Sequence, residues 1–377
     1  MRPISDTIQR LQRMQGAGMV PPVPDRLRDI VPPSRNPGNL RGRVHVPAGL
    51  APGAALVVAL HGCTQNAAAY DHGTGWSTLA DREGFAVLFP EQQRANNPNM
   101  CFNWFEAADI ARTGGEAESI AAMIDAVVAT HRIDPARVFV TGLSAGGAMS
   151  AVMLATWPEK FAGGAIIGGL PYGGALGVPQ ALDRMRGHGA PADAAAVAAV
   201  RAAAIGGPRA PRVSLWHGSA DTTVVVDNLD RLVGQWRGVH GLPPGPVEET
   251  RGRNWEHRVW RGTDGDALVE AWRIAGMGHG VPIDPASGIG AAGPFMLDVG
   301  LSSTLAIAGS WGLTGAAAAA APRVEPVAAP APRVPALAQA PAPRGRRLER
   351  MDEPRGDGGG SVQATIERAL RAAGLMR

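Results

Sequence analysis

The GLSAG pentapeptide at residues 142–146 constrains the fold most, because of what lies on either side of it. Residues 138–141 before it form a short apolar run typical of a buried strand, and residues 145–156 contain the Ala, Met and Val typical of a packed helix. Where a strand turns directly into a helix, the backbones approach closely, and flanking glycines are required. The pattern therefore predicts that Ser144 stands on a tight, strained turn above a sheet.

Further short apolar runs predict strands, and the longer segments between them predict helices. The runs at residues 55–60 and 85–89 are continuously apolar, as expected of strands covered on both faces. Further strands are predicted at 165–167, 213–216 and 270–274, and helices at 115–131, 145–156, 183–186 and 193–204. Strands and helices that alternate in this way predict an α/β fold, with a mainly parallel sheet and helices on both faces.

The chain is predicted to hold one α/β domain, at residues 38–313, with a segment on each side. Hydrophobic residues make up 45% of the chain, enough for a buried core. Residues 1–37 are predicted to form an N-terminal arm. Residues 314–360 are rich in Ala, Pro and Arg, cannot bury enough apolar surface, and are predicted to be a disordered linker. Residues 361–377 are predicted to form a short C-terminal helix or a frayed tail.

An Ala-rich insertion between residues 171 and 211 interrupts the pattern of the domain. Its predicted helices are expected to pack over one end of the sheet. They can serve as a lid over a site at that end, or form a peripheral hairpin with no gating role. The sequence leaves both interpretations open.

The net charge of +3 comes from the C-terminal tail. Residues 314–377 hold ten Arg and six acidic residues, which leaves 26 basic and 27 acidic residues in the rest of the chain. The basic residues before 314 are scattered and match no nucleic-acid-binding motif. We therefore expect no nucleic-acid partner.

A serine hydroxyl becomes a strong nucleophile only beside a base, which an acidic residue must orient, and in this type of fold the order is Ser, acid, His. Ser144 is the predicted nucleophile. Asp221 is the predicted acid, because it lies in the tight loop WHGSAD that ends a strand. Asp227 and Asp230 are weaker candidates, because they lie on the predicted helix that follows. His279 is the predicted base; its loop, GMGHG, is expected to leave the imidazole mobile and exposed.

An oxyanion that forms during attack on a carbonyl needs two hydrogen-bond donors. One is predicted to be the amide of Ala145, which follows the nucleophile. The second is expected from Cys63 or Thr64 in the loop LHGCTQ, and the sequence does not decide between them. Cys63 is also an alternative nucleophile, a weak one because no helix N-terminus is predicted after it.

Other residues near strand ends are candidates for shaping the site. His61 and His217 end strands beside glycines, and His61 is predicted to contact substrate. Trp104, in the loop CFNWF, is predicted either to support an acyl chain or to serve ordinary loop packing. Cys63 and Cys101 are the only cysteines, and they permit either one disulfide or two reduced thiols.

Taken together, these segments resemble the poly(3-hydroxybutyrate) depolymerase family of esterases, in particular the short-chain-length polyhydroxyalkanoate depolymerase catalytic domain. The matching segments, within about residues 40–313, are LHGCTQ at 60–65, CFNWF at 101–105, GLSAGGAMSAVMLATWP at 142–158, GLPYG at 169–173, WHGSAD at 216–221 and GMGHG at 276–280. The resemblance implies an α/β-hydrolase fold, the triad of Ser144, Asp221 and His279, no cofactor or metal, and hydrolysis of 3-hydroxyalkanoate polyesters or oligomers. It also implies that Cys63 and Cys101 lie near each other by the site.

Two alternative functions stay open. Feruloyl and acetylxylan esterases share the HGC and G-x-S-x-G segments, so a carboxylesterase acting on such esters is one alternative. The other is a binding protein that contacts polyester granules through its tail. Residues 1–15 lack the apolar run of a signal peptide, and no segment approaches the roughly 18 apolar residues of a membrane span. We expect a cytoplasmic location, with an extracellular one, as for many family members, as the alternative.

Overall fold

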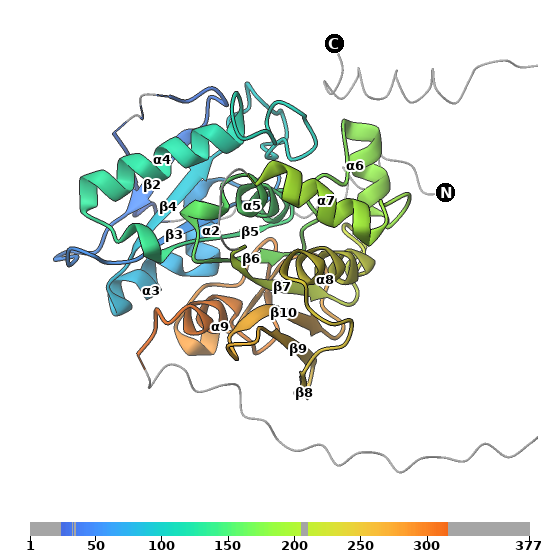
Figure 1. Cartoon of the computed structure of the whole chain (residues 1–377). Helices are drawn as coiled ribbons and strands as arrows, with labels where there is room; N and C mark the ends of the chain where they lie inside the picture. The colour runs from blue at the N-terminus through green and yellow to red at the C-terminus, as the bar shows by residue number, and fades with distance from the viewer. Residues whose placement is uncertain (1–23, 32, 34, 205–209, 316–377) are drawn as a thin grey trace, which may run out of the picture. The chain divides into compact units, whose positions relative to one another are not determined.

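A ten-stranded sheet organises the part of the chain that the structure describes (Figure 1). The structure is a computed structural model, and it describes residues 24–315 except 32, 34 and 205–209. The strand order is β1-β2-β4-β3-β5-β6-β7-β10-β9-β8. The strands are β1 (Arg28–Asp29), β2 (Arg41–His45), β3 (Leu56–Leu60), β4 (Ala86–Glu91), β5 (Val138–Leu143), β6 (Gly163–Ile167), β7 (Arg212–Gly218), β8 (Glu248–Arg251), β9 (Trp255–Arg261) and β10 (Ala267–Ile274).

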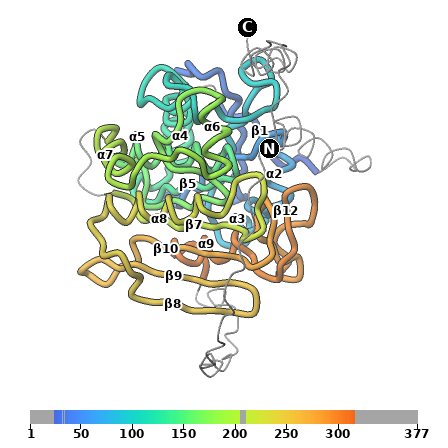
Figure 2. The backbone as a smooth tube through the Cα atoms, turned by 90° about the vertical axis from the view of Figure 1, so that its right-hand side faces the viewer, coloured from blue at the N-terminus to red at the C-terminus, as the bar shows by residue number. Residues whose placement is uncertain are grey.

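The centre of the sheet is parallel and its two edges are antiparallel. Each neighbouring pair from β4 to β10 in the strand order is parallel. At one edge β2 runs antiparallel to β4 and to β1, and at the other β9 runs antiparallel to β10 and β8. Figure 2 shows β10, β9 and β8 side by side beyond β7. The carboxyl ends of the parallel strands therefore lie along one rim of the sheet, where ligand sites of α/β folds form.

Helices cover both faces of the sheet (Figure 1). Helices α4, α5 and α8 lie on one face, with α7 against α5 and α8, while α2, α3 and α9 lie on the other. Successive residues of β3 enter the two cores in turn, as the strand periodicity requires. The helices are α2 (Ala67–Thr74), α3 (Trp76–Glu83), α4 (Glu116–His131), α5 (Ala145–Thr156), α6 (Val178–Met185), α7 (Asp193–Ala203), α8 (Asp227–His240) and α9 (Ser303–Ser310).

The predicted α/β-hydrolase architecture is confirmed, and the elements that were missed are edge strands of the sheet and helices on one of its faces. The strands β2, β8 and β9 and the helices α2, α3 and α9 were not predicted. The helix expected at 183–186 is α6, which begins at Val178, because Pro179 is tolerated in a first turn that lacks hydrogen-bond partners for its N–H groups. Within the predicted arm, Arg28–Asp29 adds strand β1 to the sheet edge. The tail predictions fall outside the described residues, apart from 314 and 315.

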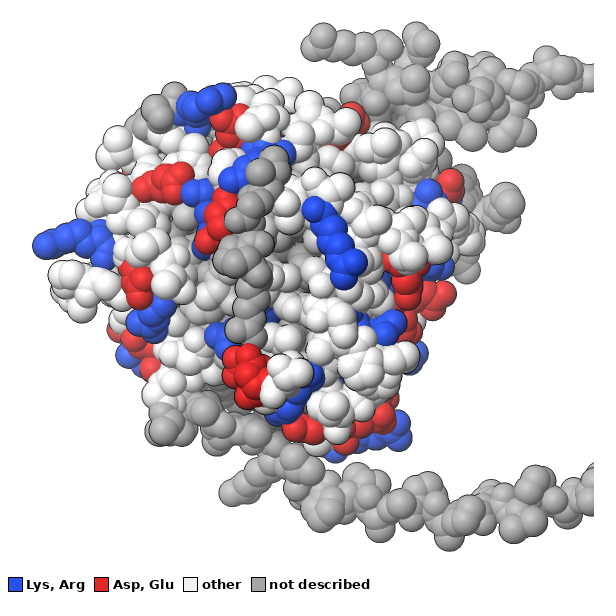
Figure 3. Space-filling model, viewed as in Figure 1, with Lys and Arg blue, Asp and Glu red and all other residues white. Residues whose placement is uncertain are grey.

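A small parallel sheet, β11 (Val281–Ile283) with β12 (Met296–Asp298), follows the loop that carries His279. Acidic and basic side chains are interspersed on the face shown in Figure 3, without an extended surface of one sign. Of the helices in the described ranges, none combines the length and apolar character needed to cross a membrane.

Candidate active site

Ser144 occupies the turn between β5 and α5 in a strained conformation, with φ 57° and ψ −117°. Its N–H donates to the carbonyl of Ile167, at 2.9 Å. A Cβ at Gly146 would lie 2.2 Å from the carbonyl oxygen of Leu60, and one at Gly142 would lie 2.4 Å from the carbonyl oxygen of Gly146. No larger residue fits at either position, which is the physical reason for the glycines of the pentapeptide.

His279 and Asp221 are brought together because β7 and β10 are parallel neighbours, so the loops after them meet. The Nδ1 atom of His279 lies 2.6 Å from Oδ2 of Asp221. The other oxygen, Oδ1, accepts from the N–H groups of Thr223 at 2.8 Å and Val224 at 2.9 Å. The structure thus joins the predicted acid and base in one contact, and the carboxylate is held rigidly.

The negative charge of Asp221 favours the form of His279 that can act as a base. Burial acts to raise the pKa of Asp221, but the neighbouring His279 and His217 outweigh it and hold the pKa well below the usual range of the carboxyl group. An ionised Asp221 keeps a proton on Nδ1 of His279 and leaves the lone pair on Nε2. This Nε2 atom is buried and has no hydrogen-bond partner among the described residues. Ser144 and His279 line the same cavity, so Nε2 is placed to serve the serine.

The structure also shows where the side chains of His279, His217 and Asp230 lie. The imidazole of His279 is only 7% exposed, so the expectation of an exposed ring was wrong. Phe295 packs edge-on against the ring, at 6.3 Å between centroids. His217 is buried, and its Nε2 donates to the carbonyl of Val224 at 2.8 Å, which holds the Asp221 loop. Asp230 points away from the site and pairs with Arg258.

Four successive amides in the loop after β3 show which one can bind an oxyanion. The N–H of Gly62 donates to Oε1 of Gln65 at 2.8 Å, that of Thr64 to the carbonyl of Asn99 at 2.7 Å, and that of Gln65 to the carbonyl of Gly62 at 3.3 Å. Within the described chain, the amide of Cys63 alone among these four has no acceptor. Cys63 also lines the cavity of the serine, so the geometry favours Cys63 over Thr64.

The second predicted donor, Ala145, is the first residue of α5, where the backbone N–H has no partner four residues earlier. The helix N-terminus also adds its partial positive charge at this point. Ala145 directly follows Ser144 in the chain, and Cys63 lines the same cavity as Ser144. This is the arrangement that an oxyanion hole requires.

Cys63 and Cys101 form a disulfide, with Cα atoms 4.2 Å apart. The bond answers the question that the sequence left open, and it excludes Cys63 as a nucleophile. The reason given from the sequence was wrong, since α2 does begin at Ala67, a few residues after Cys63. The disulfide instead attaches the oxyanion loop to the loop that precedes α4.

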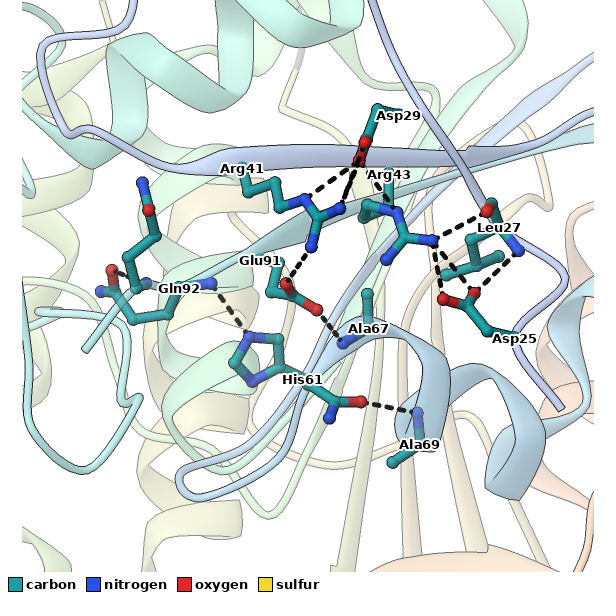
Figure 4. A network of polar contacts seen from close by, with 12 residues as sticks. Asp25, Leu27, Asp29, Arg41, Arg43, His61, Ala67, Ala69, Glu91 and Gln92 are labelled. Atoms are coloured by element: carbon teal, nitrogen blue, oxygen red, sulfur yellow. Dashed lines mark hydrogen bonds and ion pairs between the residues drawn. The ribbon is translucent and has the colours of Figure 1, made fainter. Parts of the chain in front are cut away.

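His61 supports the beginning of the oxyanion loop, and Figure 4 shows its ring in contact with Gln92. Its Nδ1 donates to the carbonyl of Gly62 at 2.8 Å, and its Nε2 accepts from the N–H of Gln92 at 3.1 Å. Burial lowers the pKa of His61, which favours the neutral ring. Next to Gln92, the carboxylate of Glu91 accepts from the N–H of Ala67 at 2.7 Å. His61 does not line the cavity, so the structure gives it a supporting place in the loop and not the predicted substrate contact.

The cavity above Ser144 has mainly apolar walls. Its lining residues are Gly62, Cys63, Gln65, Leu143, Ser144, Met185, Thr223, His279 and Phe295. Met185 ends α6, so the Ala-rich insertion supplies one wall of the cavity. Trp104 lines a neighbouring cavity with Leu170 and Arg184, and the structure does not bring it to the serine.

Glu116, which the sequence analysis missed, anchors the loop that carries Cys101. It accepts from Nε2 of Gln92 at 2.5 Å and from the N–H of Asn103 at 2.8 Å. Burial raises the pKa of Glu116 to about 8, and the neighbouring Asp109 adds to the rise. A glutamate at the start of a predicted helix is common because it complements the helix dipole. Only the tertiary contacts reveal that this one is buried.

Residues 43–261, more than half of the chain, match the family model described as Esterase PHB depolymerase. The chain belongs to this family of esterases. Poly(3-hydroxyalkanoate) depolymerase C of Paucimonas lemoignei is 46% identical to this esterase over 286 residues, which cover 74% of the chain and 68% of the relative. Acetylxylan esterase A of Aspergillus oryzae (strain ATCC 42149 / RIB 40) is 31% identical over 66% of this chain and 82% of its own.

A solved acetyl xylan esterase from Aspergillus awamori has a similar structure, with a TM-score of 0.63 and 28% identity, covering 70% of this chain and 97% of its own. The family and these relatives show that the present esterase is a carboxylic ester hydrolase. The local geometry agrees with that chemistry, because a strained serine, a buried histidine and Cys63 line one cavity, and Nε2 of the histidine has no partner in the described chain.

Proposed function

We propose that this esterase hydrolyses 3-hydroxyalkanoate polyesters or their oligomers, with Ser144 as the nucleophile. The observation that carries the proposal is the 2.6 Å contact of His279 with Asp221, beside a cavity that also holds Ser144. The 46% identity with a poly(3-hydroxyalkanoate) depolymerase supports this substrate class over the substrates of the less similar acetylxylan esterases.

The reaction proceeds by two acyl transfers. Nε2 of His279 takes the proton of the Ser144 hydroxyl as its oxygen attacks the ester carbonyl. The amides of Ala145 and Cys63 hold the oxyanion, and the ionised Asp221 stabilises the imidazolium. His279 then gives the proton to the leaving alcohol, and a water that it deprotonates hydrolyses the acyl-enzyme.

The second candidate is hydrolysis of acetyl or feruloyl groups on plant polysaccharide. It is favoured by the likeness to acetylxylan esterases in both sequence and structure. The wall formed by Leu143, Met185 and Phe295 is apolar, which suits the acyl group of either substrate, so the wall alone does not choose between them.

The test is hydrolysis by purified wild type and Ser144→Ala. The substrates are amorphous poly(3-hydroxybutyrate), its soluble oligomers, acetylated xylan and a feruloyl ester, with 3-hydroxybutyrate, acetate and ferulate quantified. Release of 3-hydroxybutyrate by wild type but not by the variant is expected. Acetate or ferulate alone would support the second candidate, and an active variant would overturn the role of Ser144.

The sequence led us to expect a cytoplasmic location, with an extracellular one as the alternative. We now propose that the protein works in an oxidising compartment, because the Cys63–Cys101 disulfide persists there and is reduced in most cytoplasms. Recovery of the reduced protein from the cytoplasm of the native cell would contradict this.

Contact with a polyester granule through residues 314–377 is a separate proposal. Deletion of those residues should then release the protein from granules without loss of oligomer hydrolysis.

A further inference from the structure

The side-chain amide of Gln65 has only one orientation that satisfies its neighbours. The N–H of Gly62 can only donate, and it lies 2.8 Å from the Gln65 amide, so the amide oxygen must face Gly62. The backbone N–H of Gln65 donates back to the carbonyl of Gly62 at 3.3 Å. These two hydrogen bonds hold the Gln65 side chain against the loop, so its nitrogen, Nε2, faces away from Gly62.

The Nε2 atom of Gln65 has no hydrogen-bond partner among the described residues, although it carries two donor hydrogens. Gln65 is half-buried and lines the same cavity as Ser144 and His279. Gln65 therefore brings a pre-oriented neutral donor to the wall of this cavity, and the reaction described above does not use it. Thr223 adds a hydroxyl, but its backbone is bound to Asp221, on the base side of the cavity.

The oxyanion does not need this donor, because the amides of Ala145 and Cys63 already serve it. The substrate proposed here has another oxygen near the reacting carbonyl, on the β-carbon of the acyl group. Acetyl groups have no such oxygen. Gln65 follows Cys63 by two residues and lines the same cavity, so a donor beside the oxyanion site suits an acceptor attached to the β-carbon, three bonds from the carbonyl carbon.

We propose that the amide nitrogen of Gln65 donates a hydrogen bond to the β-oxygen of the bound 3-hydroxyacyl group and makes Gln65 a specificity-determining residue. This inference rests on the proposed function and extends it, because it identifies the group that distinguishes 3-oxygenated acyl chains from plain ones. It also predicts that the two roles of the side chain, closing the loop and binding substrate, can be separated by substitution.

The experiment compares two methyl esters that differ only in the β-oxygen: methyl 3-methoxybutanoate and methyl 3-methylpentanoate, in which a CH₂ group replaces the oxygen. Gln65→Glu keeps an acceptor for Gly62 and removes the donor, whereas Gln65→Met removes both. The ratio of kcat/KM for the two esters cancels any change in the oxyanion hole. In both variants we expect this ratio to fall by about 2- to 12-fold, as expected for loss of one neutral hydrogen bond.

Gln180→Glu is the matched control. The Gln180 side chain caps the N–H of Leu176 in the same way, at 3.0 Å, but outside this cavity. It should leave the ratio unchanged. An unchanged ratio in Gln65→Glu would overturn the inference and reduce Gln65 to a structural residue. Failure of the proposed function is distinguishable, because wild type would then release no 3-hydroxybutyrate from oligomers, whatever the variants do.

Discussion

The Asp221 carboxylate contacts two backbone N–H groups and the ring of His279. Replacing one of its oxygens by nitrogen, as in Asp221→Asn, affects these contacts differently. Its Oδ1 accepts two backbone N–H groups, so in Asp221→Asn the amide oxygen must take that place. The amide nitrogen then faces Nδ1 of His279 as a donor, which forces the imidazole proton onto Nε2. We expect kcat to fall by about 10³- to 10⁴-fold with the fold retained, because Nε2 can no longer accept the serine proton.

Steady-state kinetics with a soluble ester, together with circular dichroism, test this expectation. Asp230→Asn serves as the control, because Asp230 is exposed and pairs with Arg258 on the surface. Near-wild-type activity in Asp221→Asn would remove Asp221 from the site and reopen the case for the helix residues that the sequence offered as alternatives.

At the scale of elements, the oxyanion loop after β3 depends on a neighbouring loop for its shape. The Cys63–Cys101 disulfide and the hydrogen bond from Thr64 to Asn99 join the two loops. Glu116 stabilises the second loop by accepting a hydrogen bond from the N–H of Asn103. These contacts keep the backbone of the loop, and with it the Cys63 amide, in a fixed position. Such rigidity is what makes an oxyanion donor effective.

The double variant Cys63→Ser/Cys101→Ser removes the covalent brace. The two cysteines are 38 residues apart in sequence, and opening a loop of this size should lower the free energy of unfolding by about 3–4 kcal/mol. We also expect a lower kcat, because the Cys63 amide becomes less well ordered. Urea unfolding and single-substrate kinetics measure the two effects, and an unaltered kcat would show that the bond does not support the oxyanion hole.

At the scale of the whole molecule, a buried carboxyl makes stability depend on pH. Burial and Asp109 raise the pKa of Glu116 to about 8 in the folded chain. A raised folded-state pKa means that the stabilising contribution is complete at acidic pH, below the pKa of the unfolded chain, and is lost as pH rises through about 8. We expect wild type to lose stability between pH 5 and about 9, by an amount that Glu116→Gln does not show.

Urea midpoints measured across this range would test the pH dependence. The substitution also costs one hydrogen bond at every pH, so the slope with pH is the diagnostic quantity and not the absolute midpoint. Glu249→Gln, on the exposed strand β8, is the control and should keep the wild-type slope. Parallel slopes for wild type and Glu116→Gln would contradict a titration at Glu116.

Local sequence was sufficient to predict the central strands and the strained turn at Ser144, and to select Asp221 and His279, which the structure brings into contact. These features depend on nearest neighbours in the chain: apolar runs, flanking glycines and a tight loop at a strand end. The edge strands β2, β8 and β9 were missed, because β2 and β9 contain no apolar run longer than two residues and β8 contains no apolar residue.

Contacts between distant segments, in contrast, were decided by the tertiary structure alone. The sequence could not choose between Cys63 and Thr64, because the answer depends on Asn99, which the strand order places beside that loop. It also could not place Trp104 in the neighbouring cavity or bury Glu116. Residue types and local spacing determined which chemistry is available, and the order of parallel strands decided which loops meet, because each loop follows the end of its own strand.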